Sequence, residues 1–521
     1  MNRSTPKMVF CIAVTILFTS QLSAEVFLPG TQPKENDIKF RKIKTCKTCH
    51  SKTKAGKDDP FFSWQGGMMS QAARDPIYRA ALTIANQDVS GVGEFCWRCH
   101  TPKGWLEGRS TKADGSNLTD EDKQGVNCQV CHRLVDPLSD EAKKLAKDVP
   151  LGYGNAMMVA DTKKTMRGPY SDIDGKMITH KILKSDFHAS GKLCGTCHDV
   201  SNPLLAKDVK TQHPYEFGHI ERTFSEWSLS AFPAKGEEGS CQHCHYPKVK
   251  GGAKASKYSK KKRPHFVTHG PVGGSTWVQD ATAYIWGDAV GSKKALDAAK
   301  ERAKTLLRTA AKLELTIGSK DQATLRITNL TGHKLPTGYP EGRRMWVNTR
   351  FLDASGKVIK ETGRYGDKET TVAGKKVTVP TLLDSGDTKV YESLPAISKA
   401  QAAKTGKPAG PSFHFVLNDT IAKDNRIPPE GFVNSKFEEH LCEPVGATYA
   451  DGQNWDDTKM AIPTGTKRIA VRIMYQSMSW EYLKFLVEEN KTDDWGKKLY
   501  DVWQNTGRCE PFVIAEIETE I

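Results

Sequence analysis

The sequence is poor in long apolar runs. Beyond its first two dozen residues, no stretch is apolar enough to cross a bilayer, so we expect no integral membrane segment in the mature chain. The region from Cys46 to His245 also lacks sustained helical or strand periodicity and has many Gly, Pro and Lys residues. A core made only of regular amphipathic elements is therefore not expected in this region.

The first 24 residues have the pattern of a secretory signal peptide. Arg3 and Lys7 supply positive charge, Met8 to Phe18 form a short apolar segment, and a small-residue exit precedes Glu25. Cys11 lies inside the apolar segment and lacks the small-residue context of a lipoprotein cysteine. We therefore predict a signal peptide over residues 1–24 and export to the periplasm or the cell exterior, without a lipid anchor.

Five copies of the motif Cys-x-x-Cys-His follow. The cysteine pairs are Cys46 and Cys49, Cys96 and Cys99, Cys128 and Cys131, Cys194 and Cys197, and Cys241 and Cys244, with His50, His100, His132, His198 and His245. Zinc sites, thioredoxin-like motifs and disulfides also use Cys-x-x-Cys, but do not need a histidine directly after every second cysteine. Two thiols so spaced can form thioethers to one porphyrin, and the histidine can bind its iron.

The motifs thus predict five covalently bound haem c groups and a protein that carries electrons. Spacing along the chain adds one expectation about their arrangement. The interval from Cys96 to Cys128 is the shortest between successive motifs, so we expect the second and third haems to form a closely packed pair.

Few cysteines remain outside the motifs. Of the thirteen in the chain, Cys11 would leave with the signal peptide and ten attach haem, which leaves Cys442 and Cys509. In an oxidising compartment we expect these two to form a disulfide; two separate buried thiols are the alternative.

The formal net charge is +15, but the propionates of five haems would offset about ten of these charges. The basic run from Lys254 to Arg263 is expected to be a solvated loop, or a surface that guides an acidic redox partner. It has no aromatic residue besides Tyr258, so nucleic acid is not an expected partner.

The composition changes near residue 290. Residues 292–315 have the apolar spacing of an amphipathic helix, and later segments alternate between polar and apolar residues as strands do. Predicted strands cover 313–317, 323–327, 344–351, 376–379, 467–475 and 511–521, with a helix over 480–490. We predict an α+β multidomain protein with a loop-rich, mostly α, haem-packed domain (25–290), a helical connector (291–315) and a β-sandwich-like domain (316–521).

Each haem iron needs a sixth ligand, and the sequence offers several histidines close to the motifs or in rigid turns. These candidates are His180, His188, His265, His269 and His333; we place His213, His219, His414 and His440 behind them. Met69, beside Met68, is a further candidate because a thioether is a recognised axial ligand. For every candidate, the alternative is an ordinary surface, hydrogen-bonded or packing residue.

Several segments resemble secreted multihaem c-type cytochromes, in the broad group that includes hydroxylamine-pathway electron carriers. They include WQGGMMSQAARDPIYRAALTIANQD, FCWRCHTPKGWLEGRS, GVNCQVCHRLVDP, ERTFSEWSLSAF and GHKLPTGYPEGRRMWV. The resemblance implies bis-His or His/Met haems in close pairs, with electron transfer as the default activity. Many relatives have W-x-x-S-x-H-x-x-A with an axial histidine; here Met69 and Phe232 stand at that position. The resemblance also implies His333 as a distal ligand that brings the β-rich domain against a haem.

Three functions remain open. We favour an exported carrier of electrons between periplasmic or extracellular redox proteins. The alternative is an oxidoreductase that acts on a small nitrogen or sulfur compound at a haem with an open sixth position. The β-rich domain could also mediate self-association into an assembly along which electrons move.

Overall fold

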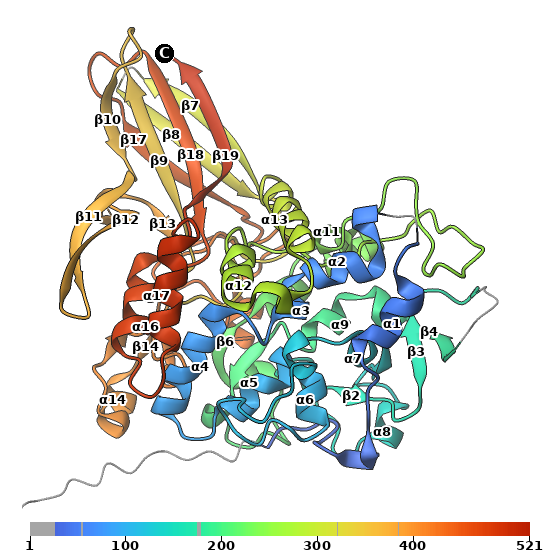
Figure 1. Ribbon diagram of the computed structural model, residues 1–521. Coiled ribbons are helices and arrows are strands. Elements are labelled where there is room, and N and C mark those ends of the chain that lie inside the picture. Colours follow the sequence, from blue (N-terminus) through green and yellow to red (C-terminus); the bar gives the residue numbers. More distant parts are fainter. Residues whose placement is uncertain (1–26, 54–55, 174–178, 320, 384) are drawn as a thin grey trace, which may run out of the picture.

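The computed structural model describes residues 27–521 except 54–55, 174–178, 320 and 384. The predicted signal peptide therefore lies outside the described residues. The chain is an α+β multidomain protein. A rounded body holds the five motifs, and a β-rich lobe made by the C-terminal part of the chain rises from it (Figure 1).

The haem-motif body consists of short helices joined by long loops. Even its longest helix, α4, has only 13 residues; Asp75 begins it by accepting hydrogen bonds from the amides of Ile77 and Tyr78, with Pro76 in the first turn. The α-helices are α1 (Ile43–His50), α2 (Pro60–Gly66), α3 (Met68–Gln71), α4 (Pro76–Asp88), α5 (Gly93–His100), α6 (Pro102–Leu106), α7 (Cys128–Arg133), α8 (Ala142–Leu145), α9 (Gly191–Gly195), α10 (Thr223–Ser228), α11 (Cys241–His245) and α12 (Val278–Trp286).

Short strands and single-turn helices complete the body. The strand pairs are β1 (Leu134–Val135) with β2 (Val159–Ala160), β3 (Thr165–Gly168) with β4 (Lys181–Lys184), and β5 (Val200–Asn202) with β6 (Gly218–Glu221). The 3₁₀ helices are η1 (Glu35–Asp37), η2 (Gly56–Asp58), η3 (Asp122–Gln124), η4 (Asp186–Ala189), η5 (Pro203–Leu205), η6 (Pro214–Glu216), η7 (Pro233–Gly239) and η8 (Gly287–Val290).

The expected amphipathic helix exists but is shorter than predicted. Helix α13 spans Lys293–Leu307, begins with Ser292 as its N-cap, and packs its buried apolar face against α2. The predicted extension to residue 315 is wrong, because Ala311–Ser319 forms strand β7. In the segment AKLEL, polar and apolar residues alternate and pair with β8, so the two-residue period prevails over the helical one.

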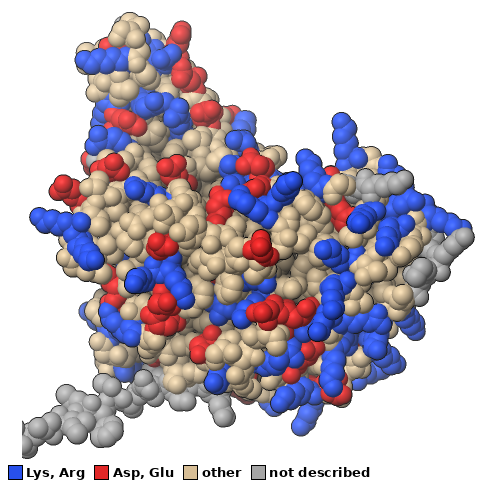
Figure 2. Space-filling view, viewed as in Figure 1, with Lys and Arg blue, Asp and Glu red and all other residues tan. Residues whose placement is uncertain are grey.

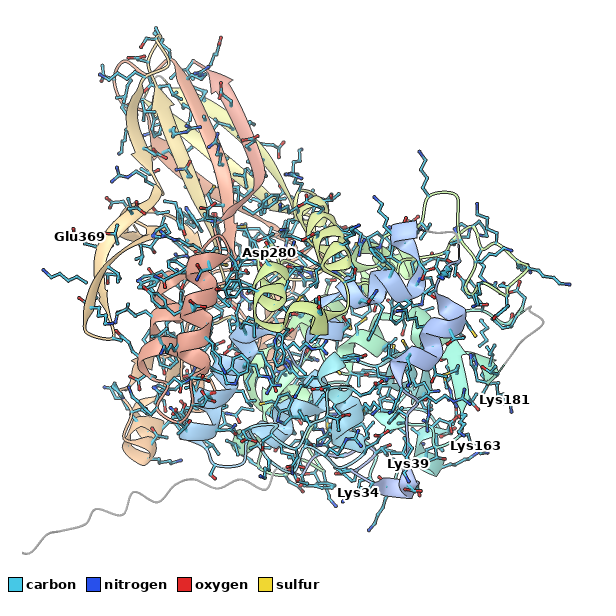
Figure 3. The ribbon with its side chains drawn as sticks, in the orientation of Figure 1. Lys34, Lys39, Lys163, Lys181, Asp280 and Glu369 are labelled. Carbon is cyan, nitrogen blue, oxygen red and sulfur yellow. The ribbon has the colours of Figure 1, made fainter. Side chains whose placement is uncertain are left out.

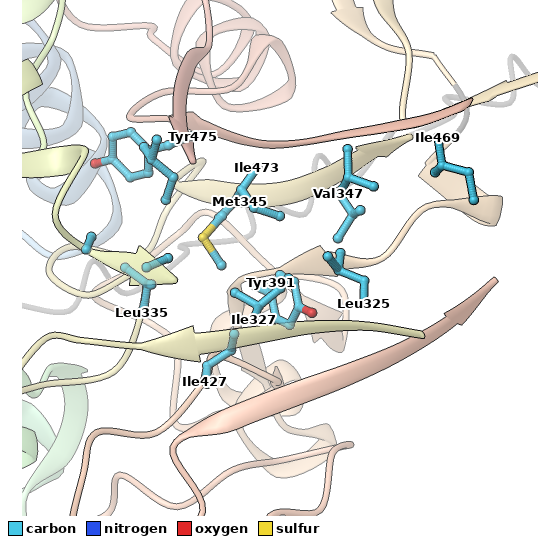
Figure 4. Packing of buried hydrophobic residues seen from close by; sticks show 14 of the residues in the cluster. Leu325, Ile327, Leu335, Met345, Val347, Tyr391, Ile427, Ile469, Ile473 and Tyr475 are labelled. Carbon is cyan, nitrogen blue, oxygen red and sulfur yellow. The ribbon is translucent and has the colours of Figure 1, made fainter. Parts of the chain in front are cut away.

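The β-rich lobe is a sandwich of two antiparallel sheets. One sheet has the order β10-β9-β18-β19, with β13 also on β9; the other has the order β17-β8-β7. Their bounds are β7 (Ala311–Ser319), β8 (Gln322–Asn329), β9 (Arg344–Leu352), β10 (Val358–Thr362), β13 (Val390–Tyr391), β17 (Trp455–Ala461), β18 (Arg468–Gln476) and β19 (Phe512–Glu520). Leu325 and Ile327 from one sheet meet Val347 and Ile473 from the other in an apolar core (Figure 4).

Additional elements extend the lobe toward the body. They are the hairpin β11 (Tyr365–Val372) and β12 (Lys375–Leu382), η9 (Ser385–Asp387), the small sheet β14 (Ser393–Ile397), β15 (Gly410–Pro411) and β16 (Thr420–Asp424), and the helices α14 (Lys399–Thr405), α15 (Asn434–Glu439), α16 (Trp480–Glu488) and α17 (Trp495–Asn505). Helices α16 and α17 pack on α4, and a shared apolar cluster that includes Ile84, Trp277 and Leu483 joins lobe and body. Among the described helices, none combines the length and apolar character that a membrane crossing requires.

Candidate haem centres

All five motifs lie on or beside a short helix. The first is on α1, the second ends α5, the third begins α7, the fourth runs from α9 into the following turn, and the fifth forms α11. A helical turn places cysteines at positions i and i+3 on one face. Each motif therefore presents two thiols together, with the histidine directly after them.

Four motif histidines are held by the same kind of contact. In each, the ring nitrogen Nδ1 lies within hydrogen-bond distance of a backbone carbonyl oxygen: His50 with Ala255 (2.7 Å), His100 with Ala72 (2.9 Å), His132 with Arg167 (2.6 Å) and His245 with Val272 (2.5 Å). Metal-binding histidines commonly donate their second ring N–H in this way, which fixes the tautomer and leaves Nε2 for the metal. The arrangement therefore suits haem ligation at Nε2.

The fourth motif differs. Nδ1 of His198 lies 3.7 Å from Oε1 of Glu221 rather than beside a carbonyl. Burial by itself would lower the pKa of His198, but the hydrogen bond and charge of Glu221 outweigh it and raise the pKa. Burial lowers the pKa of His100 and of His245 to about 4, so these two rings are neutral at pH 7, as a metal ligand must be.

Three motif histidines face a second imidazole from elsewhere in the chain. The ring centroids lie 6.4 Å apart for His50 and His180, 6.3 Å for His132 and His269, and 6.2 Å for His245 and His333. Because a metal–imidazole bond is about 2 Å long, two imidazoles on opposite faces of one iron have centroids roughly 6 Å apart. These three separations match that arrangement.

His132 also has a second neighbour, His188, with ring centroids 6.0 Å apart. Both nitrogens of His188 are engaged: Nδ1 with Oγ of Ser185 and Nε2 with the carbonyl oxygen of Cys131, each at 3.0 Å. In contrast, no described residue is hydrogen-bonded to Nε2 of His269, and a hydrogen bond with the backbone of Val267 holds its ring. Burial lowers the pKa of His269 to about 3, which keeps it neutral. His269 is thus the better opposite ligand for His132, and His188 has the contacts of a structural histidine.

The remaining predicted ligands are not brought into such pairs. In the described part of the chain, no imidazole lies opposite His100 or His198, and His265 is exposed and outside every ring pair. The ring of Tyr78 stacks on His100 at 3.5 Å instead. Met69 belongs to α3, which approaches His100 through Ala72 on the Nδ1 side of the ring. The iron would lie on the Nε2 side of His100, and a second axial ligand would lie beyond the iron on that side. These contacts therefore do not place the Met69 thioether opposite His100.

Arg302 on α13 offers a fit to the carboxylates of a porphyrin. Its three guanidinium nitrogens are buried and have no hydrogen-bond partner among the described residues. A Cβ on Gly270, the residue after His269, would lie 3.2 Å from one of these nitrogens. Arginine binds carboxylates through parallel N–H donors, so a propionate beside His269 would satisfy this group. No sequence pattern points to Arg302, Tyr78 or Glu221, because their roles depend on contacts between distant segments.

Thiols from different motifs touch one another. Contacts join Cys46 with Cys128, Cys99 with Cys197, and Cys194 with Cys241. They connect the first motif with the third, the second with the fourth, and the fourth with the fifth. The expectation that the second and third motifs form a close pair therefore finds no support in these contacts. Sequence spacing does not determine which attachment sites become neighbours.

The predicted disulfide between Cys442 and Cys509 is wrong. Both cysteines are free and buried. Cys442 packs with Phe432, Phe437 and Tyr449. Cys509 lies in the cluster that joins lobe and body, and its Sγ is 3.4 Å from Oγ of Ser477. Since the two side chains belong to separate apolar clusters, the alternative of two separate buried thiols holds.

No protein-family model matches the sequence, and no curated protein matches it. The fold is similar to that in the crystal structure of a penta-heme cytochrome c552 from Thermochromatium tepidum. The two chains are 17% identical with a TM-score of 0.53, and the match covers 92% of this chain and 100% of the other. The likeness shows a shared fold along nearly the whole chain.

Proposed function

We propose that this chain is an exported pentahaem cytochrome c that carries electrons between redox proteins of the periplasm or the cell exterior. The observation that carries the proposal is the combination of five Cys-x-x-Cys-His motifs with three opposed imidazole pairs. The ten motif cysteines would hold five haems, and the five motif histidines would be their proximal ligands. Each bound haem takes up and releases one electron at its iron.

The opposed imidazoles support three distal ligands. His180 would serve the first haem, His269 the third and His333 the fifth. For the second and fourth haems the distal ligands stay predictions. Met69 stays a prediction as well, although the contacts of α3 do not place its thioether opposite His100. His188 and His265 lose support, because one has both nitrogens engaged and the other lies outside every ring pair.

The anchoring of the rings suits an electron carrier. Contacts with backbone carbonyls restrict the rotation of four of the five motif histidines, whose rings are half-buried. A site whose ligands stay in place when the charge changes needs little rearrangement for each transfer. The chain's own contacts therefore support fast exchange of electrons between neighbouring sites.

One observation favours a second function. Neither His100 nor His198 has an opposed imidazole in the described chain, and either haem could therefore have a replaceable sixth ligand. Such a site would allow an oxidoreductase that acts on a small nitrogen or sulfur compound. The carrier remains the preferred function, since three opposed imidazole pairs support it directly.

The two functions separate in one experiment on the purified holoprotein. Its mass should equal that of the chain without residues 1–24 plus five haems; absence of covalent haem would refute the proposal. Electron paramagnetic resonance of the oxidised form and carbon monoxide binding by the reduced form then report the sixth positions. Low-spin haems that bind no carbon monoxide support the carrier. A high-spin haem that binds carbon monoxide supports the enzyme, to be tested with hydroxylamine, nitrite and sulfur oxyanions.

A further inference from the structure

Exposed lysines surround the first haem motif. Helix α1 contains no acidic residue, and Lys44 and Lys47 on it are exposed, as are Lys42 before it and Lys52 after it. Here a run of positive charge adjoins Cys46 and Cys49 directly.

The basic loop 254–263, which follows the last motif in the sequence, lies against the first motif in the fold. The amide of Lys257 donates a hydrogen bond to the carbonyl oxygen of Cys49 (2.9 Å), and the carbonyl oxygen of Ala255 contacts Nδ1 of His50 (2.7 Å). These contacts fix the loop beside α1. Lys257, Lys260 and Lys262 are exposed, so the loop adds its charge to that of the helix.

Strand β4 extends the basic region on the side of His180. Lys181 and Lys184 are exposed there, and so is Leu183 at 41%. Figure 3 shows Lys163 and Lys181 on the same side of the body, and Figure 2 shows mainly blue side chains on this side. Acidic residues reduce the charge in part: Asp172 pairs with Lys261 and Arg263, Asp186 pairs with Lys184, and Glu121 accepts a hydrogen bond from the amide of Ile43 at the start of α1.

We propose that this lysine surface is the docking site for an acidic redox protein, which exchanges electrons with the chain at the first motif. The lysine surface comprises Lys42, Lys44, Lys47, Lys52, Lys181, Lys257, Lys260 and Lys262. The proposal rests on the proposed function and adds a place and a partner to it. Complementary charge steers encounter and raises the association rate, which is what a carrier with transient partners needs.

The chemistry of the surface favours a protein over a membrane or a nucleic acid. Its charges are lysines, which act as mobile point charges, whereas Arg263 is buried and bound to Asp172. Phe61 and Tyr258, the aromatic residues beside it, are half-buried under Lys47 and Lys257. Membrane insertion or base stacking would need exposed aromatic rings. Small protein interfaces have an apolar centre and a polar rim. The exposed Leu183 with lysines around it matches that pattern.

The test uses the holoprotein and reduced flavodoxin, an acidic one-electron donor, as probe. The variant carries Lys44→Glu, Lys47→Glu and Lys257→Glu, which keep every backbone contact described above. The control carries Lys357→Glu, Lys360→Glu and Lys399→Glu on the β-rich lobe, which change the net charge equally at exposed positions. Haem content and absorbance spectra establish that each protein is intact, and dithionite reduction establishes that its haems accept electrons.

We expect the second-order rate constant for reduction by flavodoxin to fall about tenfold or more in the variant at low salt, and to change less than about twofold in the control. The difference should vanish at high salt. Equal rate constants in variant and control would overturn the docking site. Binding of both proteins to phosphatidylglycerol vesicles is measured as well, and the docking site would also be overturned if weaker vesicle binding were the only effect of the variant. Failure of dithionite to reduce any haem would instead overturn the proposed function.

Discussion

The rings of His245 and His333 face each other with centroids 6.2 Å apart, although one belongs to the haem-motif body and the other to the β-rich lobe. The residue after His333 is held firmly. The amide of Lys334 donates to Oε2 of Glu226 (3.1 Å), and its ammonium group pairs with Asp424 (2.8 Å) in full burial. Glu226 comes from α10 of the body and Asp424 from the lobe, so a network that spans both parts positions His333.

Glu226→Gln should loosen this network. Glu226 is completely buried, accepts a hydrogen bond from Oγ1 of Thr337 (2.6 Å) and pairs with Arg426 (3.0 Å). Loss of its charge leaves a buried cation undercompensated, which typically costs about 3–5 kcal/mol. We expect a lower melting temperature and an altered low-spin signal for the haem that His333 would ligate. Both are measurable on the same oxidised sample.

A control for this variant is Glu430→Gln, which removes the exposed pair with Lys235. Exposed pairs contribute below about 1 kcal/mol, so its melting temperature should stay close to that of the parent protein. An unchanged haem spectrum in Glu226→Gln would mean that Glu226 stabilises the fold without positioning His333.

His269→Ala and His188→Ala should behave differently although both rings lie near His132. Removal of His269 is expected to leave one haem without its distal ligand, and so to add one carbon monoxide molecule bound per reduced protein. Removal of His188 takes away two hydrogen bonds and should cost on the order of 1–2 kcal/mol of stability, with no added carbon monoxide binding. The reverse pattern would make His188 the ligand.

Glu341→Gln should change how stability depends on pH. Burial raises the pKa of Glu341 from its ordinary 4.5 to about 8, and its Oε2 has no hydrogen-bond partner in the described chain. The folded state therefore keeps a proton that the unfolded state releases. This contribution is complete below about pH 4.5 and is lost as pH rises toward about 8, by up to roughly 4 kcal/mol.

The glutamine variant keeps the shape of Glu341 without the titration, so its melting temperature should decline less between these two pH values. Glu369→Gln, at an exposed position of β11, serves as the control and should follow the parent protein. Parallel curves for Glu341→Gln and the parent protein would show that Glu341 is ionised in the folded state.

Cys442 and Cys509 should both be titratable thiols. Burial raises the pKa of each, so the folded holoprotein is expected to react slowly with iodoacetamide. Unfolded without a reductant, it should take up two alkyl groups, as read by intact mass. If it took up none until a reductant was added, the two cysteines would form a disulfide after all.

The sequence predicted what depends on local pattern and failed where distant segments meet. The alternating residues of β8, the apolar residues of β18 and the repeated motifs can be recognised within a few positions. In contrast, the end of α13 at Leu307 depends on pairing of the next segment with β8. Likewise, nothing near His188 in the sequence indicates that the backbone carbonyl of Cys131 would lie at its Nε2. Nothing near Cys442 or Cys509 indicates that the two would be buried in separate apolar clusters.

The thiol contacts between motifs also bear on biogenesis. Six of the ten attachment cysteines touch a cysteine of another motif, in the pairs Cys46 with Cys128, Cys99 with Cys197, and Cys194 with Cys241. Oxidation of an unloaded, folded chain would link these sulfur atoms and use up attachment sites on all five motifs at once. A thioether cannot form such a link. We therefore expect haem attachment to precede both the closure of the body and the exposure of these thiols to an oxidant.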